Sequence, residues 1–300
     1  MAEEAPAAGA PVAEASRRAR RTAQAEQVVA RPSRAGRNLP AAIGVAVLLL
    51  TLIGFSLFFW KPAFVLVVTG AAVLGVWELG QAVRHGRVDP PMPPLVLSAG
   101  LVPLAYWGGA DALTLGFVGA AALVLLWRAA GPAEGAVRDI AGGVFVVAYV
   151  PLLAAITSLM LAEPDGVWRI ITFLLVTVAS DTGGYAVGVL LGRHPMAPSL
   201  SPKKSWDGFA GSVGTSALVG ALCVALLLDG TWWAGALVGA VAAAFATVGD
   251  LAESSIKRDL GIKDMSQLLP GHGGLMDRLD SLVVTAPVCW ALLHVLLPAP

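Results

Sequence analysis

The sequence predicts an all-α integral membrane protein, a polytopic helical bundle with about nine transmembrane helices. Hydrophobic residues make up 57% of the 300-residue chain and charged residues only 13%, whereas soluble domains carry roughly 25% charged residues. Mean hydropathy is correspondingly high, at +0.75. The charged residues are concentrated in short loops between long uncharged runs, so their positions are more informative than the net charge of zero.

The N-terminal residues 1–39 are rich in Ala, Arg, Glu and Pro and show no apolar period, which is typical of a disordered tail. A cleaved signal peptide is not expected, because the basic region is long and the apolar run after it is long enough to span a bilayer. The two cysteines, Cys223 and Cys289, lie inside apolar runs. Their placement favours buried thiols over a disulfide or a metal site.

Nine apolar runs follow the tail, and most approach the roughly 20 residues that a helix needs to cross a bilayer. They are 41–60, 62–83, 94–109, 111–129, 139–161, 167–191, 209–228, 231–250 and 282–298. The third run is short, and Pro94 and Pro103 favour a boundary or a kink there. We divide the chain into the tail, N-terminal helices over 40–165, and a region over 166–300 that contains the unusual charged loops.

The basic residues support this count, because Lys and Arg favour the cytoplasmic side of short membrane loops. If the Arg-rich tail is cytoplasmic, nine spans place four further loops on the same side. These loops are 84–93, 130–138, 192–208 and 251–281. With the flanking Arg128, the tail and these loops hold all of the 20 basic residues except Lys61 and Arg169. We therefore expect a cytoplasmic N-terminus and a C-terminus on the opposite side.

A first group of functional candidates surrounds loop 192–208. Asp181 stands 13 residues after Trp168, about 20 Å along a helix, and a carboxylate inside the bilayer usually marks a functional site facing a wet cavity. An early end of this span would instead put Asp181 at the interface. Ser201, Lys203 and Lys204 provide donors and charge that suit phosphates, although paired lysines beside a membrane can also serve only to bind lipid headgroups.

A second group of candidates lies at the ends of loop 251–281. Asp250 ends the eighth run, and Asp277 and Asp280 share one face at the start of the ninth. Helix capping would explain Asp277 and Asp280 but not Asp250, which opposes the dipole at a helix C-terminus. A shared Mg²⁺ would relieve that penalty, because this cation prefers a few carboxylates together with water and substrate phosphates.

The glycine-rich turn before the last helix is expected to bind phosphate, because backbone N–H groups at a helix N-terminus favour anions. Basic residues of the same loop add positive charge, although each alone is also compatible with a solvated loop. The substrate-binding candidates here are Lys257, Arg258, Lys263, His272, Gly273, Gly274 and Arg278. Phosphate and metal groups at a membrane surface suggest a nucleotide that reacts with a lipid; a nucleic acid partner is not expected.

These residues resemble the signature of phosphatidate cytidylyltransferases, also called CDP-diacylglycerol synthases. The pattern begins at Ser254 with S-x-I-K-R, continues with K-D-x-S from Lys263, and ends with L-P-x-H-G-G-L-x-D-R-L-D at Asp280. Two earlier segments are similar to family motifs, DTGGYAVG from Asp181 and SPKKSWDG from Ser201. The departures are Gly184, Ser205 and Asp207, where the family usually has Ala, Thr and Glu.

The resemblance implies an enzyme of the inner membrane that condenses CTP with phosphatidic acid to give CDP-diacylglycerol and pyrophosphate, usually as a homodimer. It also implies roles for the residues above. Mg²⁺ would bind Asp250 and Asp277 with support from Asp280, phosphates would bind Ser201, Lys203 and Lys204, and Asp181 would face the polar cavity. Two alternatives remain, a transporter with an intramembrane carboxylate and a CTP-using polyprenol kinase.

Overall fold

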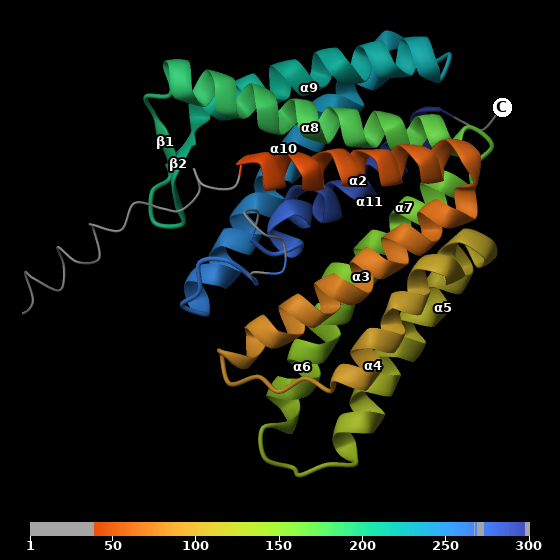
Figure 1. Ribbon diagram of the computed structural model, residues 1–300, viewed down its shortest axis with the longest axis vertical. Helices are drawn as coiled ribbons and strands as arrows, with labels where there is room; N and C mark the ends of the chain where they lie inside the picture. The colour runs from red at the N-terminus through yellow and green to blue at the C-terminus, as the bar shows by residue number, and fades with distance from the viewer. Residues whose placement is uncertain (1–38, 267, 269–272, 298–300) are drawn as a thin grey trace, which may run out of the picture.

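The computed structural model describes residues 39–266, 268 and 273–297, and this part of the chain is helical apart from one small hairpin (Figure 1). In the first half the elements are α2 (Leu39–Phe59), α3 (Lys61–Arg84), α4 (Met92–Leu97), η2 (Ser98–Gly100), α5 (Leu101–Ala129), α6 (Ala136–Val147), η3 (Ala148–Leu152) and α7 (Leu153–Ala162). In the second half they are α8 (Gly166–Leu191), β1 (Pro195–Ala197), β2 (Ser201–Ser205), α9 (Trp206–Leu227), α10 (Trp232–Asp259) and α11 (Met276–Leu296).

Seven helical stretches among the described residues are long and apolar enough to cross a membrane, so the predicted count of nine is not confirmed. Two differences account for the lower number. In α2 only Leu50–Phe59 enters the count over the described residues, as a shorter apolar helix. The runs predicted at 94–109 and 111–129 form a single stretch, Met92–Ala129, made of α4, η2 and α5.

This long stretch reverses its direction at Gly109, whose φ of 72° and ψ of −165° are not helical. A positive φ costs a glycine little because it has no Cβ. Beyond the reversal the chain returns along itself, since Leu101 and Leu104 lie on one side of a groove and Gly116 and Leu123 on the other. Met92–Ala129 is therefore a helical hairpin, and its two arms correspond to the two predicted runs.

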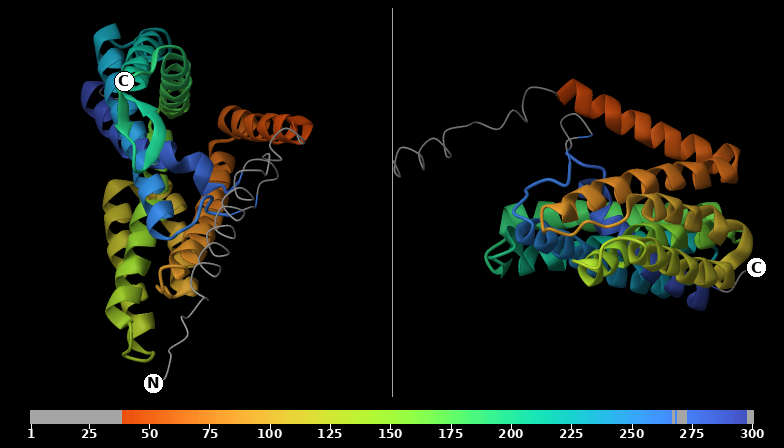
Figure 2. Two further views of the ribbon diagram at one scale, coloured as in Figure 1. Left: turned by 90° about the vertical axis from the view of Figure 1, so that its left-hand side faces the viewer. Right: turned by 90° about the horizontal axis from the view of Figure 1, so that it is seen from below.

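The helices fall into two groups that meet at α7 and α11 (Figures 1 and 2). In the first group α5 packs on α6 and α7, and α3 packs on α5 and α6, with α2 lying outside α3 (Figure 2). In the second group α8 packs on α9, α9 on α10 and α10 on α11. A π-helical turn, η3, separates α6 from α7 and contains Pro151.

Small and hydroxyl-bearing residues bring α8, α9 and α10 close together. Between α8 and α9, the Ser212 hydroxyl donates to the Ser180 carbonyl oxygen at 2.8 Å. Between α9 and α10, a Cβ added to Gly220 or Gly235 would collide with the backbone of the other glycine. Small residues and interhelical hydrogen bonds are the usual means by which helices associate in a bilayer, where apolar burial provides little driving force.

The ends of α3, α8 and α10 at Arg84, Leu191 and Asp259 lie on one side of the molecule, away from the ends of α7 and α9 (Figure 1). The predicted basic loops thus gather on one side, and the assignment of that side to the cytoplasm stays a prediction. α10 continues nine residues past its predicted end at residue 250, and α11 begins six residues before residue 282. The predicted loop 251–281 is therefore partly helical.

Candidate active site

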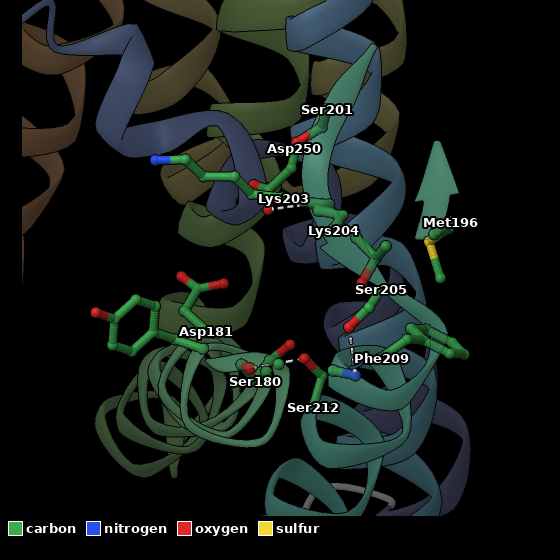
Figure 3. Close-up of a pocket in the computed structure, with 15 residues that line it drawn as sticks. Ser180, Asp181, Met196, Ser201, Lys203, Lys204, Ser205, Phe209, Ser212 and Asp250 are labelled. Atoms are coloured by element: carbon green, nitrogen blue, oxygen red, sulfur yellow. Dashed lines mark hydrogen bonds and ion pairs between the residues drawn. The ribbon is translucent and has the colours of Figure 1, made fainter. Parts of the chain in front are cut away.

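A polar cavity of about 360 Å³ opens between α8, the β1–β2 hairpin, α9 and α10 (Figure 3). We call it the α8–α10 pocket. Five side chains that the sequence predicts to be functional line it: Asp181, Ser201, Lys203, Lys204 and Asp250. The structure thus brings together residues that are up to 69 positions apart in the sequence.

The ion pair between Lys204 and Asp250 crosses this pocket. Its Nζ–Oδ2 distance is 2.5 Å, and the two side chains are 25% and 27% exposed. Lys203, the preceding residue of β2, is more exposed and lies at the rim. The pocket therefore contains a positive and a negative group that a single ligand could contact.

The hairpin and the start of α9 are held in place by hydrogen bonds to their own side chains. Ser205 is the N-cap of α9, and its hydroxyl accepts from the Gly208 N–H at 3.1 Å. Asp207 Oδ2 accepts from the N–H groups of Arg193 and His194 at 2.7 and 3.0 Å. The shorter carboxylate at position 207, one of the departures from the family pattern, thus fastens the start of α9 to the segment before β1.

Glycines line the floor of the pocket, so backbone atoms are exposed there. Gly184 and Gly188 of α8 and Gly208 of α9 line it, and a Cβ on Gly184 would collide with the Ser212 hydroxyl. Asp181 projects into the cavity from the same helix (Figure 3). Missing side chains let a ligand phosphate approach the helix closely, which larger residues would prevent.

A buried acidic group lies beside the pocket, and one of its members, Glu253, was not predicted from the sequence. Glu253 is fully buried on α10, and its Oε2 pairs with Lys257 Nζ at 2.8 Å. The Asp280 carboxylate lies within interaction distance of Glu253. Glu253 follows Asp250 by three residues, so a helix extended past position 250 would have placed both on one face.

Asp277 is turned toward the α10–α11 connection. Its Oδ1 pairs with Lys257 Nζ at 2.8 Å, while its Oδ2 accepts from the N–H groups of Met265 and Gly274 at 3.0 and 2.9 Å. Lys257 therefore bridges Glu253 and Asp277 instead of lining the pocket. The substrate-binding role of Lys257 stays a prediction.

The N-terminus of α11 is occupied by carboxylates of the protein itself. Besides the Gly274 N–H, which binds Asp277, the N–H groups of Leu275 and Met276 donate to Glu78 of α3 at 2.9 and 2.8 Å. These three N–H groups are therefore not open to a phosphate in the structure. Gly273 adopts a φ of 80°, and His272 lies outside the described residues.

The remaining candidates lie away from the pocket lining. Arg258, Lys263 and Arg278 are exposed side chains around the same connection, and none of the three is among the described residues that line the α8–α10 pocket. The structure thus places the pocket residues on α8, β2 and α10, while these three lie at the end of α10, on the connection and at the start of α11.

Within the described part of the chain, no three acidic, His or Cys side chains are arranged so that they could hold a metal ion. The predicted trio is divided, since Asp250 pairs with Lys204 and Asp277 with Lys257. Mg²⁺ does not require a trio, because one or two carboxylates with water and substrate phosphates suffice.

The donor chemistry beside the pocket nevertheless fits a divalent cation. The carboxylates of Asp181, Asp250 and Asp280 lie close enough to repel one another. Two buried oxygens, Glu253 Oε1 and Tyr149 Oη, have no hydrogen-bond partner in the described residues. A surplus of negative charge and unsatisfied oxygens is the environment that a hard cation stabilises.

Comparisons with known proteins agree with this chemistry. The model of the cytidylyltransferase family matches residues 40–296. A phosphatidate cytidylyltransferase of Mycobacterium leprae (strain TN) is 40% identical over 282 residues, which cover 88% of this chain and 90% of the relative. Relatives of the same name from Mycobacterium bovis and Synechocystis are 37% and 32% identical, covering 90% and 87% of this chain and 93% and 97% of their own lengths.

Proposed function

The chain belongs to the cytidylyltransferase family, and we propose that it is a CTP:phosphatidate cytidylyltransferase that forms CDP-diacylglycerol and pyrophosphate for phospholipid synthesis. The observation that carries this proposal is the α8–α10 pocket, where Lys203 and Lys204 of the hairpin meet Asp181 and Asp250 of two membrane helices. Such a pocket would admit both a nucleotide from the water and a lipid headgroup from the bilayer.

The reaction depends on positioning and on charge neutralisation. A phosphate oxygen of phosphatidic acid attacks the α-phosphorus of CTP, a new P–O bond forms, and the bond to the bridging oxygen breaks as pyrophosphate leaves. The attacking phosphate is already anionic near neutral pH, so no strong general base is needed. The residues must instead hold two anions together in the correct orientation.

The pocket residues suit these tasks. Lys203 at the rim and Lys204 deeper in the cavity would bind phosphate oxygens, with the Ser201 hydroxyl as a further donor. Bound phosphate would compete with Asp250 for Lys204, which frees the Asp250 carboxylate as the substrate enters. The bare backbone at Gly184 and Gly188 provides room for a phosphate group.

We further propose that the reaction depends on Mg²⁺, which would be held by Asp250 together with Asp277 and Asp280 at the start of α11. When bound, the cation would neutralise charge on the phosphates. Release of Asp250 from Lys204 and of Asp277 from Lys257 would make their oxygens available. Glu253 and Asp181 would add negative charge around the cation.

We propose that the protein lies in the inner membrane as a homodimer, with its N-terminus and the pocket on the cytoplasmic side. The apolar helices and the bacterial relatives support a membrane location. The side on which the basic loops gather supports the orientation.

Labelled CTP tests the function. Purified protein is incubated with phosphatidic acid, Mg²⁺ and CTP that carries ³²P at either the α- or the γ-position, and the label in extracted lipid is counted. Transfer of the α-label only is expected, and it should stop when EDTA removes the metal. Transfer of the γ-label would identify a lipid kinase, and the absence of both would favour a transporter.

A further inference from the structure

We infer that Glu78, a residue of the N-terminal helix group, is a positioning residue for the transfer reaction because it fixes the start of α11. This inference depends on the proposed function. Glu78 lies on α3, outside residues 170–290, where the functional motifs occur. Nothing in its local sequence, VWELGQ, indicates a role at the site.

The Glu78 carboxylate is fully buried and accepts three hydrogen bonds. Its Oε1 accepts from the Ser266 hydroxyl at 2.5 Å and from the Leu275 N–H at 2.9 Å. Its Oε2 accepts from the Met276 N–H at 2.8 Å. One side chain thus joins α3 to both sides of the turn that precedes α11, across more than 185 residues of sequence.

The surrounding residues leave room for this contact. Gly75, one turn before Glu78, faces Met276, and a Cβ there would lie 2.8 Å from the Met276 sulfur. A Cβ on Gly274 would lie 3.0 Å from Glu78 Oε2 and 2.9 Å from Asp277 Oδ2. Larger side chains at either glycine would push α3 away from the start of α11.

The physical role of Glu78 follows from the groups that it binds. A carboxylate inside a membrane helix is expensive unless it is fully hydrogen-bonded. Here it accepts from backbone N–H groups at the positive end of the α11 dipole, a favourable place for negative charge. The helix whose start it fixes carries Asp277 and Asp280 within its first turns.

The consequence for the reaction is positional. Gly274 donates to Asp277 immediately beside the two N–H groups that Glu78 binds. A shift of Leu275 and Met276 would therefore move Asp277 and its partner Lys257. A misplacement of about 1 Å near the reacting groups can reduce the rate about 100-fold.

The test replaces the carboxylate with an amide of the same shape. In Glu78→Gln the side chain loses its charge and directs an NH₂ group at one of the two backbone N–H donors, so the start of α11 should shift. We expect kcat to fall about 100-fold while KM for CTP changes less than about threefold. Ser266→Ala removes one of the three hydrogen bonds without forcing donors together, and kcat should fall by only about two- to fivefold.

Asp139→Asn is the matched control, because Asp139 is also a buried carboxylate that binds a backbone N–H, that of Asp89 at 2.9 Å. Both variants should lower the melting temperature in detergent, but Asp139→Asn should keep its turnover per folded molecule. Unchanged kcat in folded Glu78→Gln would overturn the inference. The inference would also be overturned if Glu78→Gln and Asp139→Asn lost turnover in the same proportion to their loss of stability. An inactive wild-type protein would instead contradict the proposed function.

Discussion

The two helix groups use buried carboxylates in opposite ways. In the first group both oxygens of Asp139 have partners, since Oδ1 accepts from the Asp89 N–H at 2.9 Å and Oδ2 pairs with Arg128 at 2.9 Å. In the second group Glu253 has a buried oxygen without a partner in the described residues, and the exposed Asp181 beside it lies among acidic neighbours that repel it. Carboxylates with a partner for each oxygen, here called saturated, hold helices together. Carboxylates with an unpartnered oxygen or with acidic neighbours indicate where a ligand binds.

Glu78 belongs to the first helix group but binds residues of the second. It is saturated like Asp139, yet its partners belong to the connection and helix that carry Asp277. The first helix group is therefore more than a membrane anchor, because one of its side chains determines where the acidic start of α11 lies.

The largest effect is expected when the acidic cluster beside the pocket loses a charge. Asp250→Asn should reduce CDP-diacylglycerol formation about 1,000-fold or more, because it removes both a cation ligand and the partner of Lys204. Asp229→Asn is the control, since Asp229 is exposed in the α9–α10 turn and has a φ of 48° that Asn also tolerates. Activity in the two variants that differs by less than tenfold would contradict the assignment.

A smaller loss is expected at the hairpin. Lys204→Gln should lower turnover about 100-fold, because one charge-assisted phosphate contact is lost in a partly closed pocket. Lys203→Gln, at the exposed rim, should raise KM for CTP more than it lowers kcat. Equal kinetic changes at both lysines would show that the depth of the side chain in the pocket is unimportant.

The smallest effect on turnover is expected in the saturated group. Arg128→Gln breaks a pair whose side chains are 12% and 7% exposed, so stability should fall by about 3 kcal/mol. The rate per folded molecule should stay within about twofold, because Arg128 of α5 and Asp139 of α6 are not among the described residues that line the pocket. Thermal unfolding in detergent and an activity assay on the same sample separate the two quantities. A large loss of turnover without unfolding would show that the two groups do not differ as described.

Much of this arrangement could be predicted because it depends on local composition. The run predicted at 167–191 corresponds to α8 (Gly166–Leu191), and the run at 62–83 to α3 (Lys61–Arg84). A helix that crosses a bilayer must be apolar throughout, so its length appears directly in the sequence. The spacing of Asp181, Lys204 and Asp250 relative to the helix ends likewise predicted residues that the structure brings into one pocket.

Other features depend on contacts between distant segments and have no local signal. The local sequence of Glu78 is that of an ordinary helix residue. Only the packing of α3 against the start of α11 provides its three hydrogen-bond donors. The extension of α10 to Asp259 was missed because hydropathy falls where the helix leaves the apolar region. The pair of Glu253 with Lys257, four residues apart, stabilises that polar end. By contrast, the boundary predicted between the runs 94–109 and 111–129 coincides with Gly109, where the long apolar stretch reverses.

If the β1–β2 hairpin and the extended end of α10 form one site, both must lie on the same side of the membrane. Single cysteines at Ser199 in the hairpin connection and at Asp259 at the end of α10, both exposed positions, can be probed with a membrane-impermeant maleimide in inverted and right-side-out vesicles. The two native cysteines are buried and provide a low background. We predict that both positions react only in inverted vesicles, while a cysteine at Asp229 reacts only in right-side-out vesicles. Reaction of Ser199→Cys and Asp259→Cys from opposite sides would contradict the account.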